Sequence, residues 1–178
     1  MKLDPQKLVA PPRPRYFDGR ALTAADLHAE QNYRREKAWL HNRMLHGYGI
    51  VSGLDVTVQE NENGAAQVVI APGYALDGYG RELIVPESLS VAVGQARRDF
   101  VVYLEFAERA DAASVVPLAD GAPQATRISE TVRVLFEPPT ERLTPPPARA
   151  DFAIPLARVR KPHQQWQHDR TFRPPRAK

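Results

Sequence analysis

The sequence predicts an α+β protein: one long N-terminal helix, then an antiparallel β-sandwich or open barrel, with an extended proline-rich arm at each end. Three observations favour this fold class. Residues 24–46 contain neither proline nor glycine, short alternating segments follow Gly47, and several of the 17 prolines cluster near the two termini. Helices and strands do not alternate along the chain, so a doubly wound α/β fold is not expected.

Charge divides the 178 residues into three parts. Residues 1–20 carry five basic and two acidic side chains, and residues 158–178 carry seven basic and one acidic. The net charge is +3, so the ends contribute +3 and +6 and the middle is left with −6. We therefore expect a basic arm over 1–20, a domain of helix and strands over 21–160, and a basic, proline-rich tail over 161–178. Proline-rich ends of this kind favour extended conformations.

The helix is predicted over residues 24–46, because both of its ends carry signals. Thr23 is a preferred N-cap residue, and Asp26 three residues later completes an acidic form of the capping box. Gly47 follows the last helical residue, where a left-handed backbone commonly ends a helix.

The apolar residues of this helix do not form one broad face. A helix on a domain core normally presents an apolar sector at least about 100° wide. Two interpretations stay open: the helix lies across one sheet with a solvated back, or other subunits contact it on several sides through polar residues. The apolar positions fall into two thin strips: Tyr33, Leu40 and Met44, and Leu27, Ala38 and Leu45.

The region after Gly47 is predicted to consist of short strands. Apolar and polar residues alternate over 54–59, as in a half-buried strand, and turn residues separate the later segments. We expect long loops over 108–127 and 137–150 and a hairpin turn over 61–64. Strands are expected at 54–59, 67–71, 74–76, 82–85, 89–93, 100–106, 131–136 and 154–159.

Six glycines are expected to serve turns, and they form two groups: Gly47, Gly49 and Gly53, and Gly73, Gly78 and Gly80. The first group permits a tight reversal from helix to strand, and the second permits a compact hairpin in which Asp77 faces Arg81. The second group is not expected to form a phosphate site, because none of its glycines precedes a helix.

The residues do not indicate an enzyme, a metal site or a cofactor. The absence of cysteine excludes disulfides, cysteine zinc sites and thiol catalysis. His41 and His46 lie about 140° apart around the helix, so they do not chelate one ion. No serine lies in a Gly-x-Ser-x-Gly context, and the acidic pairs are those of an ordinary solvated surface.

Composition also bears on partners and location. No fingerprint of a nucleic-acid-binding module accompanies the basic ends, so docking on protein neighbours is favoured over nucleic acid binding or solubilising tails. No apolar run approaches the ~20 residues that cross a bilayer, and the N-terminus lacks a signal peptide's apolar region. We expect a protein made in the cytoplasm, without membrane insertion.

Two stretches resemble a bacterial family of tail-fibre-like or baseplate-associated proteins of phage tails and phage-tail-like contractile injection systems. The resemblance covers roughly residues 15–105, about half of the chain. A cell-binding fibre would continue into a shaft and a tip, so the resemblance favours a connector or a baseplate decoration. The first stretch is Tyr16-Phe17-Asp18-Gly19-Arg20-Ala21-Leu22-Thr23-Ala24-Ala25-Asp26-Leu27, continuing through Glu30-Gln31-Asn32-Tyr33 to His41-Asn42-Arg43-Met44-Leu45-His46-Gly47-Tyr48-Gly49-Ile50-Val51-Ser52-Gly53-Leu54. The second stretch is Ala71-Pro72-Gly73-Tyr74-Ala75-Leu76-Asp77-Gly78-Tyr79-Gly80-Arg81-Glu82-Leu83.

The resemblance implies a non-enzymatic structural component that docks on other baseplate or tail subunits and is assembled into an injection particle. A homo-oligomer is expected, with a trimer favoured. The alternative is a glycan- or surface-binding β-sandwich module that uses Trp39, Trp166 or Tyr79. The residues expected at the protein interface are Tyr16, Phe17, Leu22, Gln31, Tyr33, Arg34, His41, Arg43, Trp166 and Phe172.

Overall fold

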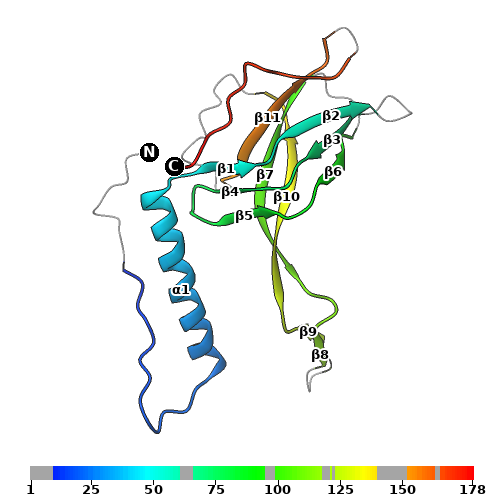
Figure 1. The fold of residues 1–178 in the computed structure, drawn as a ribbon. Helices are drawn as coiled ribbons and strands as arrows, with labels where there is room; N and C mark the ends of the chain where they lie inside the picture. The colour runs from blue at the N-terminus through cyan, green and yellow to red at the C-terminus, as the bar shows by residue number, and fades with distance from the viewer. Residues whose placement is uncertain are drawn as a thin grey trace.

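The computed structural model describes residues 10–60, 66–94, 99–117, 121, 123–139, 152–162 and 165–178. One helix precedes a body of antiparallel strands (Figure 1), so the predicted α+β fold class is confirmed. The hairpin turn expected over 61–64 and most of the loop expected over 137–150 lie outside the described residues.

Helix α1 spans Ala24–Leu45 and begins as its sequence predicts. The Thr23 hydroxyl accepts a hydrogen bond from the Asp26 backbone N–H at 3.2 Å, and Asp26 Oδ2 accepts one from the Thr23 N–H at 3.0 Å. This is the complete capping box, which satisfies two backbone donors at the helix start. The segment before α1 runs back along the helix (Figure 1), where the Tyr16 hydroxyl donates to Glu30 Oε2 at 3.4 Å.

The described residues form three antiparallel sheets, which make up the body, and one small hairpin. The first sheet has the order β1-β4-β5, with β1 Gly49–Gly53, β4 Gly73–Leu76 and β5 Glu82–Val85. The second is β2-β3-β6, with β2 Val56–Glu60, β3 Ala66–Ile70 and β6 Leu89–Ala92. The third is β10-β7-β11-β12, with β10 Ile128–Glu137, β7 Asp99–Ala110, β11 Ile154–Arg160 and β12 Gln167–His168. The small hairpin pairs β8 Val115–Pro117 with β9 Pro123–Ala125.

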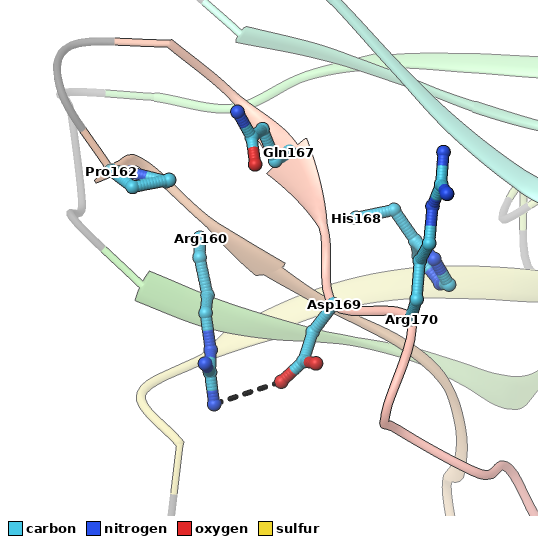
Figure 2. Close-up of a pocket in the computed structure, with 6 residues that line it drawn as sticks. All are labelled: Arg160, Pro162, Gln167, His168, Asp169 and Arg170. Carbon is cyan, nitrogen blue, oxygen red and sulfur yellow. Dashed lines mark ion pairs between the residues drawn. The ribbon is translucent and has the colours of Figure 1, made fainter.

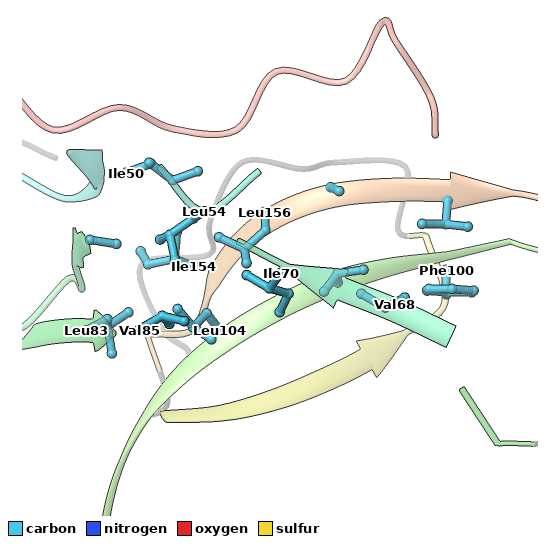
Figure 3. Packing of buried hydrophobic residues seen from close by; sticks show 14 of the residues in the cluster. Ile50, Leu54, Val68, Ile70, Leu83, Val85, Phe100, Leu104, Ile154 and Leu156 are labelled. Atoms are coloured by element: carbon cyan, nitrogen blue, oxygen red, sulfur yellow. The ribbon is translucent and has the colours of Figure 1, made fainter. Parts of the chain in front are cut away.

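The hydrophobic core lies between these sheets, and every sheet contributes to it. Removal of this apolar surface from water is the main source of the body's stability. Figure 3 shows the packing of its aliphatic side chains near Phe100 on β7. The labelled members are Ile50, Leu54, Val68, Ile70, Leu83, Val85, Phe100, Leu104, Ile154 and Leu156.

The β7–β10 hairpin extends beyond this core. Its register runs from Glu137 opposite Val101 to Ile128 opposite Ala110. Side chains are buried at the start of β7, but those of Glu108–Ala110 and of the first four residues of β10 are exposed. The outer half of the hairpin therefore leaves the body, in the direction in which α1 also extends (Figure 1).

Several strands differ from the expected pattern. Strand β1 was not among those expected, and β8 and β9 form within the segment 108–127 that we expected to be a loop. Strand β12 lies within the expected C-terminal tail. Each of these strands exists because of a pairing partner and not because of a run of alternating residues.

The described C-terminal residues pack against the body instead of extending from it. The Phe172 side chain is only 8% exposed. The backbone of Ile50 pairs with the tail on both sides: its N–H donates to Pro175 O at 2.9 Å, and its carbonyl accepts from Ala177 N–H at 3.2 Å. The Lys178 N–H donates to His46 O at 2.9 Å, so the end of the tail also satisfies a carbonyl at the end of α1.

Deletion of residues 174–178 is expected to lower the free energy of unfolding by about 1–3 kcal/mol, since each lost backbone hydrogen bond contributes about 0.5–1.5 kcal/mol. Urea denaturation followed by circular dichroism measures this loss. Arg176→Gln keeps the backbone bonds and is the control, with an expected change within about 0.5 kcal/mol. A deletion no more harmful than the control would show that the tail pairing does not stabilise the body.

Candidate interaction site

Helix α1 stands outside the hydrophobic body. It has 22 residues, and none of them is buried. Leu27 and Leu45 are 53% and 61% exposed, and the preceding Phe17 and Leu22 are 61% and 56% exposed. The helix therefore does not lie across a sheet with one apolar face covered, which was the first of the two interpretations of its sequence.

Polar contacts attach α1 to the body. Asn42 Nδ2 donates to Gly80 O at 2.9 Å, and an Arg43 guanidinium N–H donates to Tyr79 O at 2.7 Å. Farther along the helix, Arg35 forms an ion pair with Glu108 at 3.4 Å on the outer part of β7. The first two contacts reach the turn between β4 and β5, and we call this attachment, made by Asn42, Arg43 and the turn, the helix joint.

A buried carboxylate shapes the turn of the helix joint. Asp77 is fully buried, and its Oδ1 accepts hydrogen bonds from the N–H groups of Tyr79 and Arg81, both at 2.9 Å. Its Oδ2 accepts from Arg81 Nε at 2.5 Å. Gly80 has φ +89° and lies directly against the Trp39 carbonyl oxygen. Asp77 thus presents the turn's carbonyls to α1, and the expected pairing of Asp77 with Arg81 is present.

Two residues of the segment before α1, Tyr16 and Arg20, contact acidic side chains of the helix. Arg20 forms an ion pair with Asp26. Hydrogen bonds from the Thr23 side chain and backbone, and then Arg20, hold the pKa of Asp26 below its usual value. Burial, followed by the nearby Glu30 carboxylate, raises the pKa of Tyr16. Because the pKa of Asp26 is lowered on folding, its contribution is present above the ordinary carboxylate pKa and is lost as pH falls through the lowered value.

Eight of the expected interface residues lie on α1 or on the segment before it. Their side chains are exposed except for those of Tyr33 and Arg43, which are half-buried. Arg43 already donates to Tyr79 O, and Arg34 forms an ion pair with Glu30 at 2.7 Å. The eight are Tyr16, Phe17, Leu22, Gln31, Tyr33, Arg34, His41 and Arg43.

The two remaining expected interface residues lie in the body. Phe172 is buried, and the Trp166 ring lies 5.6 Å from that of Phe100. Trp39 and Tyr79 belong to the neighbourhood of the helix joint, where the Arg35 guanidinium lies 5.1 Å from the Trp39 ring. The aromatic residues of the alternative surface-binding module are therefore divided between two places.

The six glycines expected at turns all occupy places where a side chain would be strained or would collide. Gly53 lies against Pro72 O, and Gly49 has Pro175 O within 2.6 Å of where a Cβ would stand. A Cβ at Gly73 would overlap the Leu54 backbone, and one at Gly78 the Phe152 ring. The φ angles that favour glycine are +74° at Gly47, +128° at Gly49, +60° at Gly53 and +89° at Gly80.

Neither a metal site nor a membrane-spanning helix is found in the described part of the chain. No group of three or more histidine, aspartate or glutamate side chains there is placed to hold a metal ion. The rings of His41 and His46 lie 5.7 Å apart at the end of α1. Among the same residues, no helix is long and apolar enough to cross a bilayer.

Comparison with solved structures finds chains that have a similar architecture. The fold resembles that of type VI secretion baseplate proteins. A chain in a cryo-electron microscopy structure of the type VI secretion system TssK–TssF–TssG baseplate subcomplex matches with a TM-score of 0.58 and 14% identity, over 94% of this chain and 62% of that one. The crystal structure of TssK matches with a TM-score of 0.57 and 11% identity, over 91% of this chain and 41% of that one.

A third match is a chain of the baseplate complex from the type VI secretion system, with a TM-score of 0.53 and 14% identity, over 93% of this chain and 42% of that one. The chain thus spans less than two thirds of the length of each of these baseplate chains. No protein-family model matches the sequence, and no curated protein does. At these identities the likeness establishes a baseplate-like fold.

Sequence reasoning missed one exposed part of this baseplate-like fold, the end of the β7–β10 hairpin. Val115, Val116 and Ile128 are 41%, 49% and 66% exposed there. The adjacent β-branched residues Val115 and Val116 favour a strand and could have indicated it, but the alanine, aspartate and proline around them favoured a loop.

Proposed function

We propose that this protein is a non-enzymatic structural component of a contractile injection apparatus, a baseplate connector that docks on neighbouring subunits through α1 and the segment before it. The observation that supports this most directly is a 22-residue helix without a buried residue. Most helical stability in proteins comes from packing against other elements. Because the fold resembles that of baseplate proteins, we expect neighbouring subunits of such an apparatus to pack against α1, which the body leaves uncovered.

The proposed interface consists of the exposed side chains of α1 and the preceding segment. Phe17, Leu22 and Leu27 provide apolar area at the helix start, and Leu45 provides it at the helix end. Burial of apolar side chains of this kind against a partner removes their surface from water, which favours association. Tyr16, Gln31, Tyr33, Arg34 and His41 provide the polar surroundings.

The proposed partners are other baseplate subunits and further copies of the chain, in a homo-oligomer for which a trimer is favoured. The protein would be made in the cytoplasm and then assembled into the particle. Several modest contacts made at once can hold a subunit firmly, because each bound contact raises the effective concentration of the next.

The double substitution Leu27→Asp and Leu45→Asp is expected to reduce incorporation into particles at least tenfold, because two buried charges at an interface cost several kcal/mol. The tagged protein would be purified from its native host, and the eluate examined by negative-stain electron microscopy and mass spectrometry. For the unmodified chain we expect tubular sheathed particles with sheath, tube and baseplate proteins.

The matched control is Val51→Asp with Ile84→Asp, which places the same charges at aliphatic side chains of the body that are 47% and 53% exposed. Circular dichroism checks that both double variants fold. Equal loss of incorporation in the control would contradict the role of α1. A clean oligomer without sheath or baseplate partners, purified from the unmodified strain, would contradict the baseplate function itself.

A further inference from the structure

A hollow of about 750 Å³ opens beside strands β11 and β12, away from the helix contacts described above. Figure 2 shows its lining side chains, which come from the end of β11, from β12 and from the residues just after it. Most of them are basic or amide side chains. The lining residues are Arg160, Pro162, Gln167, His168, Asp169 and Arg170.

Among the described residues that line the hollow, Asp169 is the one carboxylate, and the protein itself already neutralises it. Asp169 Oδ1 accepts hydrogen bonds from the Thr171 N–H at 3.0 Å and the Thr171 hydroxyl at 2.6 Å. Its Oδ2 pairs with Arg160 at 2.8 Å and lies 4.0 Å from Arg158 Nε. The Thr171 hydrogen bonds, and then the two arginines, lower the pKa of Asp169. An incoming anion therefore meets a carboxylate whose charge is balanced by arginine.

Donors remain available around this balanced pair. Within the described residues, the side chains of Gln167, His168 and Arg170 make no hydrogen bond or ion pair, and Arg170 and His168 are exposed. The segment 158–178 carries seven basic side chains and one acidic side chain, and two of the basic ones, Arg158 and Lys161, also pair with Asp99 and Glu60. The hollow thus combines free donors with a positive local field.

We propose that this hollow binds the carboxylate side chains of an acidic segment of a partner protein. The planar guanidinium of Arg170 can donate two parallel hydrogen bonds to a carboxylate. Among the described residues, no phenylalanine, tyrosine or tryptophan lines the hollow, and single-stranded nucleic acid sites rely on such rings for base stacking. The neighbouring Trp166 ring is occupied by Phe100 at 5.6 Å and by the Lys161 ammonium at 4.8 Å.

The experiment measures binding of a fluorescent hexaglutamate peptide to the full-length chain by fluorescence anisotropy. We expect saturable binding that weakens as salt rises, because salt screens exposed charges. Arg170→Gln is expected to weaken it roughly tenfold, because the glutamine amide can still donate one hydrogen bond but has lost the second donor and the positive charge. The control is Arg109→Gln, which removes the same charge from an exposed side chain on the outer part of β7 and is expected to change the affinity less than about twofold.

Three results would overturn the proposal: no saturable binding, equal weakening by the two substitutions, or tighter binding of single-stranded oligothymidine that also depends on Arg170. The last result would assign the hollow to nucleic acid. The measurement uses the isolated chain, so its outcome does not depend on particle assembly and is distinguishable from failure of the proposed baseplate role.

Discussion

Asp77→Ala is expected to lower the free energy of unfolding by about 3–5 kcal/mol, as for other buried ion pairs from which one partner is removed. Asp77 is fully buried and accepts three hydrogen bonds, from Tyr79 N–H, Arg81 N–H and Arg81 Nε. Its removal leaves two backbone donors and a guanidinium without an acceptor in the tight turn between β4 and β5. Urea denaturation, followed by circular dichroism, measures the loss.

The matched control is Asp18→Ala, because Asp18 also lies in a turn next to a glycine but is exposed. Its expected effect is within about 0.5 kcal/mol. A loss of less than about 1 kcal/mol for Asp77→Ala would mean that water or a rearranged turn replaces the carboxylate, and that Asp77 does not hold the turn.

Gly80→Ala is expected to loosen the helix joint as well as to destabilise the body. The φ angle of +89° alone costs a residue with a side chain about 1–3 kcal/mol. The added Cβ would also overlap the Trp39 carbonyl oxygen and stand 3.0 Å from the Trp39 carbonyl carbon. Since backbone cannot rotate away, α1 must shift, and the Asn42 hydrogen bond to Gly80 O must lengthen. Hydrogen exchange in the last two turns of α1 should become faster.

Gly19→Ala separates the two causes. Gly19 has a similar φ of +84° but nothing lies within 4 Å of where its Cβ would stand. It should show the backbone cost without faster exchange at the end of α1. Unchanged exchange in Gly80→Ala would contradict the importance of the joint for the position of the helix.

Features that depend on neighbouring residues could be predicted from the sequence. The capping box of Thr23 and Asp26 and the glycine after the helix fixed the bounds of α1 to within one residue, because their hydrogen bonds span one helical turn. The pairing of Asp77 with Arg81 was predictable for the same reason, since both residues belong to one turn.

Features that depend on distant residues were not predictable. The backbone of Ile50 pairs with that of Pro175 and Ala177 across more than two thirds of the chain, and nothing in the composition of either segment indicates this partner. The proline-rich sequence of the tail favours an extended backbone, which is equally suited to a free arm and to pairing with an edge strand. Only the fold distinguishes the two.

The same division between features set by neighbouring residues and features set by distant residues applies to the candidate interaction site. Tyr16, Phe17 and Leu22 were expected to be available to a partner, and their side chains are exposed. Trp166 and Phe172 were expected at the interface, but large aromatic side chains are suited to a hydrophobic core as well as to an interface. Leu27 and Leu45 belong to one of the two thin apolar strips that the sequence predicts for the helix, but their exposure depends on where the body lies relative to the helix.

The helix joint has a mechanical consequence. A rod of 22 residues is about 33 Å long at 1.5 Å per residue, and a tilt of about 10° at one end moves the other end by roughly 6 Å. The ion pair of Arg35 with Glu108 joins two exposed side chains, so it resists such a tilt by less than about 1 kcal/mol. The far end of α1 can therefore follow a neighbour whose distance varies, while the strands behind the joint keep their geometry.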